Sequence, residues 1–151
     1  IKNGIILQMT RLIQRIIIHC AATKPGQVCN AKIIDKWHKE KGYKCIGYHY
    51  VILPDGTIET GRKEQEKGAH CTGYNSDSIG ICYVGGLDKD GKPTDTRTIE
   101  QKIALINIIQ DLCSRYKIKS IAGHNDYNKN KACPCFNAKE EYKYYINDEK
   151  N

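Results

Sequence analysis

Residues 14–19 read QRIIIH, and these six residues decide the fold class. Three consecutive isoleucines without polar alternation are typical of a central strand that is covered on both faces of its sheet. Residues 78–84 (SIGICYV) form a second apolar run, and residues 119–122 form a short third one that enters Gly123-His124. We therefore expect several strands of one sheet, with the first strand in its interior.

Two helices are predicted between these strands. Asn30 can cap a helix that runs to about Lys41, and Gly42 is placed to end it. Residues 98–101 (TIEQ) have the capping-box pattern, and the apolar residues behind them recur at helical spacing as far as Tyr116. Each helix would therefore present one apolar stripe to the sheet.

A β-hairpin is predicted between the two helices. Residues 47–53 (GYHYVIL) and 57–60 flank Pro54-Asp55-Gly56, a sequence that suits a tight turn. A last helix is expected after Phe136. Strands that alternate with helices in this order indicate an α/β fold, a mixed central β-sheet flanked by helices.

Length and composition fit one domain. The chain has 151 residues, of which 40% are hydrophobic and 27% are charged, as in globular proteins. We divide it into an N-terminal extension (1–13), a globular domain (14–138) and a C-terminal tail (139–151) that is expected to fray from Glu140. Residues 1–9 (IKNGIILQM) lack the cleavage site of a secretory leader, and Met9 is a candidate start.

Charge and hydropathy argue against two classes of function. The 24 Lys and Arg residues exceed the 17 Asp and Glu residues by 24 − 17 = 7 positive charges. They form no run of five to eight basic residues, and no helix-turn-helix or zinc-finger spacing is present, so no nucleic-acid partner is expected. No apolar run reaches the ~18–20 residues of a membrane span.

Two of the five histidines stand at the carboxyl ends of predicted strands. Ligands gather at that edge of open α/β sheets, and His19 and His124 lie there. Nine residues after His124 comes Cys133-Pro134-Cys135, in which either sulfur could be a ligand. Two imidazoles and one thiolate are a good zinc set that leaves a fourth position open. The spacing alone matches no local metal motif, so ordinary hydrogen-bonded histidines are the alternative.

The other three histidines carry weaker signals. His38 lies among lysines on a helix whose apolar stripe is elsewhere, so we expect it to be solvated. His49 faces opposite to its neighbours Tyr48 and Tyr50 in a strand, and a structural role and a site role are equally open. His70, in a predicted loop, could line a site, although the sequence gives it no partner.

An ordered series of motifs carries a family resemblance from about Ile16 to Phe136. The chain resembles the zinc-dependent N-acetylmuramoyl-L-alanine amidases of the type 2 amidase and peptidoglycan-recognition-protein group, especially the T7-like phage lysozymes. The motifs are His19-Cys20-Ala21-Ala22-Thr23-Lys24-Pro25, Trp37-His38-Lys39-Glu40, Gly47-Tyr48-His49-Tyr50, Asp55-Gly56-Thr57-Ile58-Glu59, Gly61-Arg62, Gly68-Ala69-His70, Gly73-Tyr74-Asn75, Ser78-Ile79-Gly80-Ile81, Gly85-Gly86, Gly123-His124 and Lys131-Ala132-Cys133-Pro134.

The resemblance assigns roles to single residues. It implies that Zn²⁺ is held by His19, His124 and Cys133, which favours the first sulfur of Cys133-Pro134-Cys135. The catalytic residues implied are Tyr48 and Lys131, and the positions that resemble the substrate groove are His70 and Asn75. Cys135 departs from the phage relatives, which carry serine there.

The implied reaction is hydrolysis of the amide bond between N-acetylmuramic acid and L-alanine of the peptidoglycan stem peptide. The partner is then peptidoglycan, whose anionic groups would attract the positive chain, and we expect a monomer that is made in the bacterial cytoplasm and acts on the cell wall. A recognition module that binds muropeptides without cleaving them is the alternative. Glu59 and Asp126 are the carboxylates to test as a general base or as partners of the histidines, with solvated surface charges as the ordinary interpretation.

If Cys133 is a metal ligand, seven cysteines remain, and seven cannot all pair within one chain. We expect a mostly free, reduced set. Buried apolar positions are predicted for Cys20, Cys82 and Cys113. Disulfide bonding stays open for Cys29, Cys45 and Cys71.

Overall fold

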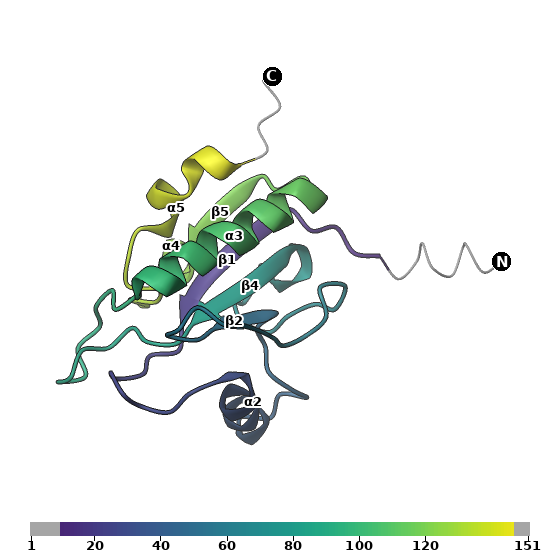
Figure 1. The fold of residues 1–151 in the computed structure, drawn as a ribbon. Helices are drawn as coiled ribbons and strands as arrows, with labels where there is room; N and C mark the ends of the chain where they lie inside the picture. The colour runs from purple at the N-terminus through teal and green to yellow at the C-terminus, as the bar shows by residue number, and fades with distance from the viewer. Residues whose placement is uncertain (1–9, 147–151) are drawn as a thin grey trace.

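The computed structural model describes residues 10–146, so Met9 and the last part of the predicted tail lie outside the described residues. The described residues form strands and helices that alternate along only part of the chain (Figure 1). In chain order they are β1 (Arg15–Cys20), α2 (Ala31–Glu40), β2 (Tyr50–Ile52), β3 (Ile58–Thr60), the 3-10 turn η1 (Asn75–Asp77), β4 (Ser78–Tyr83), α3 (Ile99–Arg115), β5 (Ser120–Gly123), α4 (His124–Tyr127), α5 (Ala138–Glu141) and the 3-10 turn η2 (Lys143–Tyr145).

Five strands form one mixed sheet in the order β3-β2-β4-β1-β5. The β2–β4, β4–β1 and β1–β5 pairs are parallel, whereas β3 pairs antiparallel with β2 through the predicted hairpin. The isoleucine-rich strand β1 lies between β4 and β5, and its three isoleucines are fully buried. The predicted mixed α/β fold is therefore confirmed, and the carboxyl ends of four strands meet at one edge.

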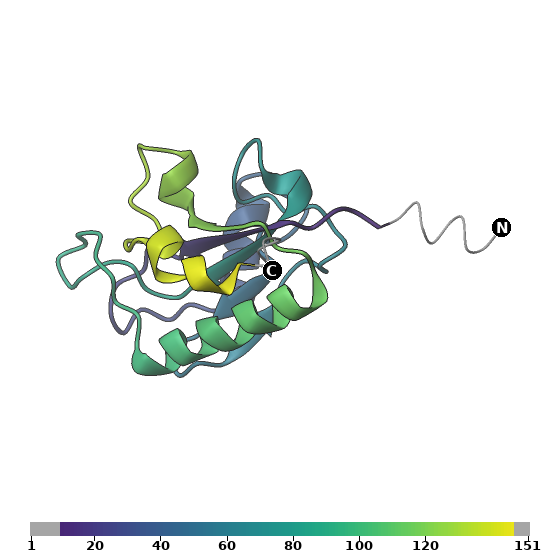
Figure 2. The ribbon, with the colours of Figure 1, turned by 90° about the horizontal axis from the view of Figure 1, so that it is seen from above.

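Helices α3 and α2 cover opposite faces of the sheet (Figures 1 and 2). On the α3 face, Ile16 and Ile18 pack in a large aliphatic cluster with Leu105. On the α2 face, Ile34 packs in a smaller cluster with Cys82. Because side chains alternate along a strand, Ile17 and His19 of β1 turn away from the α3 cluster and toward the α2 face.

Both long helices begin at the predicted residues. The Asn30 side chain accepts a hydrogen bond from the Ile33 amide at 2.9 Å, and Thr98 and Gln101 form the capping box. Gly42 follows the end of α2 with a φ of +97°, a conformation that disfavours side chains. Local sequence chemistry thus sets the helix ends as predicted.

A cluster of hydrogen bonds centred on Glu64 ties the first residue of β2 to the end of α3. The Glu64 carboxylate accepts from the hydroxyls of Tyr50 and Tyr116, and both of its oxygens accept from the Arg115 guanidinium at 2.7–2.8 Å. Arg115 is the main cause that lowers the pKa of Glu64 to about 2. The carboxylate therefore stays charged and uses its acceptors within the protein.

The predicted fraying from Glu140 is wrong for residues 140–146. Tyr142 is 1% exposed and belongs to the α3-side core, because α5 folds back onto β5 (Figure 2). Arg97 fixes this segment: it pairs with Glu141 at 2.8 Å, donates to the Tyr142 hydroxyl at 3.0 Å and lies over the Phe136 ring at 3.4 Å. The packed domain therefore extends beyond residue 138.

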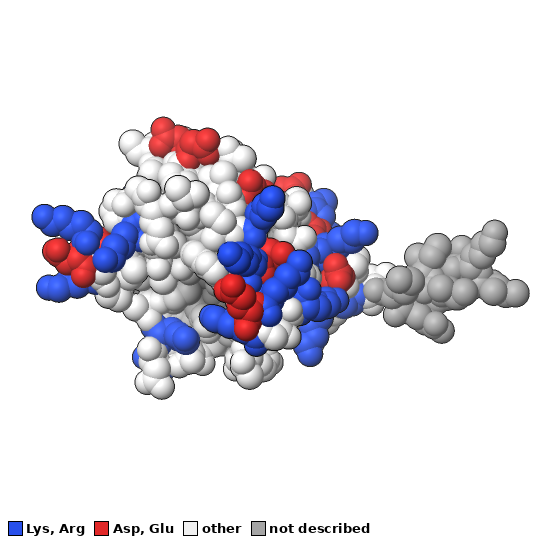
Figure 3. Space-filling model, turned by 90° about the horizontal axis from the view of Figure 1, so that it is seen from below, with Lys and Arg blue, Asp and Glu red and all other residues white. Residues whose placement is uncertain are grey.

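The surface seen from the α2 side carries both signs of charge (Figure 3). Several of its lysines are paired, as in Lys39–Asp35 at 2.9 Å and Lys44–Glu66 at 3.0 Å. Basic and acidic side chains intermix on this face. Among residues 10–146, no helix is both long and apolar enough to cross a membrane.

Candidate metal centre

The parallel pairing of β1 with β5 brings His19 and His124 together. Ile18 lies opposite Gly123 in the register, so the next residue of each strand projects at the same edge. The two imidazole rings are 4.7 Å apart, centroid to centroid. Two histidines 105 residues apart in the sequence thus become neighbours because their strands are adjacent.

Cys133 joins this pair from the loop that follows α4. Its sulfur accepts a hydrogen bond from the Cys20 amide at 3.2 Å, and its carbonyl oxygen accepts from the Asn125 amide at 2.8 Å. Among the described residues, His19, His124 and Cys133 are the group of three whose ligand atoms lie within 4.8 Å of one another. Two nitrogens and one sulfur at this separation fit a tetrahedral zinc site with one open position.

The protonation of the histidines suits metal binding. Burial lowers the pKa of His19 well below its ordinary value, and the neighbouring His70 and His124 lower it further. Burial also lowers the pKa of His124, with a smaller contribution from Lys131. Both rings are therefore neutral near pH 7, which leaves each a nitrogen lone pair to offer to a cation.

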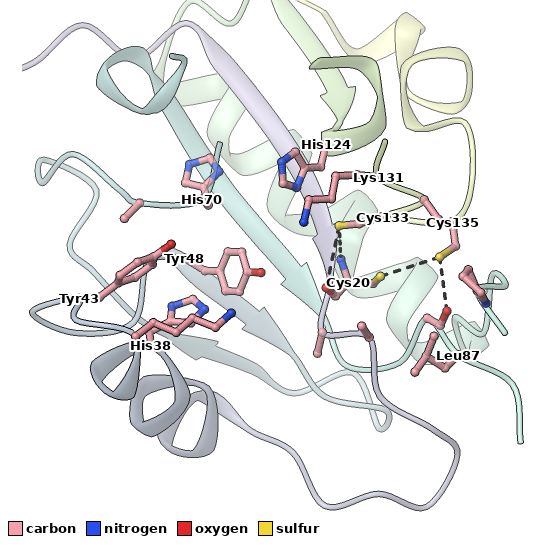
Figure 4. Close-up of a pocket in the computed structure, with 17 residues that line it drawn as sticks. Cys20, His38, Tyr43, Tyr48, His70, Leu87, His124, Lys131, Cys133 and Cys135 are labelled. Carbon is pink, nitrogen blue, oxygen red and sulfur yellow. Dashed lines mark hydrogen bonds between the residues drawn. The ribbon is translucent and has the colours of Figure 1, made fainter. Parts of the chain in front are cut away.

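A cavity of about 400 Å³ opens beside the cluster. Figure 4 shows Lys131 and Cys133 on one side of it and Tyr48 and His38 on the facing side. The Tyr48 ring lies 5.0 Å from that of His19. Burial raises the pKa of Tyr48 well above its ordinary range, so its hydroxyl keeps its proton. The fold thus brings together the five residues predicted as metal ligands and catalytic groups.

An adjoining cavity of about 380 Å³ shares five lining residues with the first one: Tyr43, Ala69, His70, His124 and Lys131. The two predicted groove residues, His70 and Asn75, border it. Asn75 also organises the loop, since its side-chain oxygen accepts from the backbone amides of His70 and Cys71 at 2.9 Å. The two cavities therefore form one continuous cleft that passes His124.

The prediction that His38 is solvated is wrong. Its Nδ1 accepts a hydrogen bond from the Gly47 amide at 2.8 Å, and its ring packs against Tyr43 and Tyr48. The chain returns over α2 at these residues and covers a position that looks exposed on the helix alone. Sequence patterns within the helix carry no signal for this contact.

His49 has a structural role. It is fully buried, its Nδ1 accepts from the Gly80 amide at 3.0 Å, and its Nε2 lies 2.8 Å from the Glu66 carbonyl oxygen. Because Nδ1 accepts, Nε2 carries the proton and donates to that carbonyl. His49 therefore links β4 to the loop that precedes His70.

The two carboxylates singled out in the sequence bind backbone amides. Glu59 accepts from the Ala31 amide at 2.8 Å, at the start of α2, and Asp126 accepts from the Gly123 amide at 2.8 Å. Asp126 thereby shapes the turn that presents His124. Both carboxylates support backbone turns.

All eight cysteines are free. Cys20 and Cys82 are buried, as predicted, whereas Cys113 is half-buried. The Cys20 and Cys135 sulfurs lie 3.9 Å apart, and the Cys135 thiol donates to the Gly86 carbonyl oxygen at 3.4 Å (Figure 4). Cys135 therefore has partners away from the metal cluster.

Comparison with known proteins gives one consistent family. The family described as N-acetylmuramoyl-L-alanine amidase matches residues 9–136. The endolysin of Enterobacteria phage T3 is 42% identical over 126 residues, which is 83% of each chain, and that of Escherichia phage T7 is 42% identical over 124 residues, which is 82% of each chain. The solved N-acetylmuramoyl-L-alanine amidase LysC from Clostridium intestinale superposes with a TM-score of 0.77 at 28% identity, and the match covers 91% of this chain and 89% of LysC.

Proposed function

The chain belongs to the N-acetylmuramoyl-L-alanine amidase family and is a peptidoglycan hydrolase, and we propose that it works with a zinc ion held by His19, His124 and Cys133. The single observation that carries the proposal is the convergence of two neutral imidazoles and one sulfur beside an open cavity. Bound zinc would act as a Lewis acid that polarises the scissile carbonyl and makes water more acidic.

The bond to be cut joins N-acetylmuramic acid to L-alanine of the stem peptide. An amide is a poor electrophile, so the site must stabilise the negative charge that develops on its oxygen. Lys131 supplies a positive charge at the border of both cavities, where such an oxygen would lie. The protonated hydroxyl of Tyr48 can donate a hydrogen bond from the facing wall and so orient the reacting groups.

The second cavity offers a place for the remainder of the substrate. We assign the stem peptide to the side bordered by His70 and Asn75, and the substrate is then peptidoglycan in the cell wall. An excess of seven positive charges favours approach to an anionic wall.

Digestion of purified sacculi tests the proposal. Wild-type protein should release intact stem peptides with free L-alanine amino termini, detected by mass spectrometry. A chelator should abolish release, and added Zn²⁺ should restore it. Cys133→Ala should lower the rate at least ~10³-fold because the metal and its charge are lost together.

Cys113→Ala is the matched control, since Cys113 lies on α3 and lines neither cavity, and this variant should digest at the wild-type rate. Cleavage within the stem peptide or the glycan would contradict the bond assignment. Pelleting with sacculi without digestion would identify a recognition module instead.

A further inference from the structure

His70 is a half-buried histidine to which the proposed reaction gives no chemical step. Its Nδ1 lies 2.8 Å from Nε2 of His19, and its own Nε2 lies 3.2 Å from the Ser78 hydroxyl oxygen. The His19 and His70 rings are perpendicular, with an interplanar angle of 87°, so the nitrogen of one ring meets the other ring edge-on. Three side chains from the α2 face of the sheet thus form one polar chain.

The hydrogen bond between the two rings restricts where the protons can be. A contact between two imidazole nitrogens needs one donor and one acceptor. If His70 were the donor, the His19 Nε2 lone pair would be used and the neutral ring would carry its proton on Nδ1. No nitrogen of His19 would then be left for a metal.

The opposite direction leaves a ligand atom free. His19 then carries its proton on Nε2 and donates it to His70, so that Nδ1 of His19 keeps a lone pair. His70 carries its own proton on Nε2, where the Ser78 hydroxyl can accept it. One direction of this chain is therefore compatible with metal binding by His19.

The packing around His70 holds its ring beside His19. Its backbone amide is fixed by Asn75, and the ring lies against the backbone of Gly80 in β4. A Cβ atom at Gly80 would lie 2.6 Å from Cδ2 of His70, and one at Gly68 would lie 2.7 Å from the same atom. Two glycines thus make the space that this ring fills.

We propose that His70 is a positioning residue, which accepts the Nε2 proton of His19 and so holds that ring in the tautomer and orientation needed to bind the metal. This inference rests on the proposed metal site. Partners that orient a ligating histidine are typically worth 10–100-fold in metal affinity.

Two amide substitutions separate this role from a merely structural one. Asparagine places its side-chain oxygen near the position of Nδ1, so His70→Asn keeps an acceptor for His19. Glutamine places its amide near the position of Nε2, so His70→Gln keeps a polar contact with Ser78 and loses that acceptor. His70→Ala removes both contacts.

Zinc affinity, measured by competition with a chromophoric chelator, is the deciding readout. We expect His70→Asn to stay within about 3-fold of wild type, and His70→Gln and His70→Ala to lose 10–100-fold. The absorption spectrum of the Co²⁺-loaded protein should shift in the same two variants. Thermal unfolding of the metal-free forms should be equal for His70→Asn and His70→Gln, which excludes a folding defect as the cause.

The outcomes distinguish the two proposals. If wild-type protein binds no zinc, the proposed metal site fails. If wild type binds zinc and all three variants bind it equally well, or if the two amide variants lose equal affinity, the metal site stands and the positioning role of His70 is overturned.

Discussion

The two edges of the parallel strands each hold a cluster of polar groups, and the clusters differ in how their members are paired. At the amino-end edge, Glu64 accepts from two tyrosines and from Arg115. At the carboxyl-end edge, the ligand atoms of His19, His124 and Cys133 converge within 4.8 Å without an opposite charge among them. In the first cluster the acceptor oxygens of Glu64 are satisfied by donors of the same chain. In the second cluster two nitrogens and one sulfur converge and can offer their lone pairs to a single bound cation.

The difference in pairing indicates a stabilising role for the Glu64 cluster and a functional role for the histidine–cysteine cluster. A buried polar group that finds its partners inside the protein stabilises the fold. Lone pairs that converge beside a cavity create a place for a cation instead. We therefore expect substitutions at the carboxyl edge to lower activity and substitutions at the amino edge to lower stability.

Replacing Lys131 should have the largest effect among substitutions that leave the metal in place. Lys131→Ala removes a positive charge at the border of both cavities, so the rate of peptidoglycan digestion should fall 10²–10³-fold, about 3–4 kcal/mol. Zinc affinity should stay within a few-fold of wild type. Lys129→Ala, at an exposed lysine in the same loop, is the control and should keep full activity. Equal losses in both variants would mean that Lys131 has only a general electrostatic effect.

Replacing Glu64 should act on stability and spare activity. Glu64→Gln removes the charge that pairs with Arg115, at a cost of about 2 kcal/mol in the free energy of unfolding near pH 7, after allowance for solvent around the half-exposed Arg115. Denaturant unfolding measures this loss, and zinc affinity should not change.

The difference in stability between wild type and Glu64→Gln should depend on pH. The pKa of Glu64 is about 2 in the folded protein and ~4.3 in the unfolded chain, so its charge stabilises the fold above pH ~4.3. That contribution is lost as the pH falls from ~4.3 through about 2. The stability difference between wild type and Glu64→Gln should therefore shrink over this range, and a constant difference would show that the charge is not its source.

Replacing Cys135 should have the smallest effect on stability and activity. It also tests which of Cys133 and Cys135 binds the zinc ion. A serine hydroxyl can still donate to the Gly86 carbonyl oxygen, so Cys135→Ser should change stability by less than about 1 kcal/mol. It should keep one bound zinc per chain, measured by metal analysis, whereas Cys133→Ser should lose it. Loss of zinc in Cys135→Ser would move the ligand to the second sulfur.

Much of the carboxyl edge could be predicted from the sequence because strand patterns are local. The isoleucine run of β1 and the short run of β5 each end at a histidine, and parallel pairing then places His19 beside His124. The helix caps at Asn30 and Thr98 were predictable for the same reason, since a cap depends on three or four consecutive residues.

The remainder depends on contacts between segments far apart in the chain. His38 looks solvated within α2 and is covered by residues 43–48, and the contact of His70 with His19 spans 51 residues. No periodicity encodes which loop residue meets which strand residue. The resemblance to amidases marked His70 as a site residue but gave no sign of its contact with His19.

The packing of the C-terminal segment determines where this domain can be cut or joined to another protein. Because Arg97 and the buried Tyr142 hold residues 138–146 against the core, a chain that stops at residue 138 would expose the apolar surface that Tyr142 covers. A fusion partner or affinity tag therefore belongs after η2, beyond Tyr145. A domain transferred into another wall-degrading protein should therefore extend at its C-terminal end beyond residue 136, where the match with the family ends.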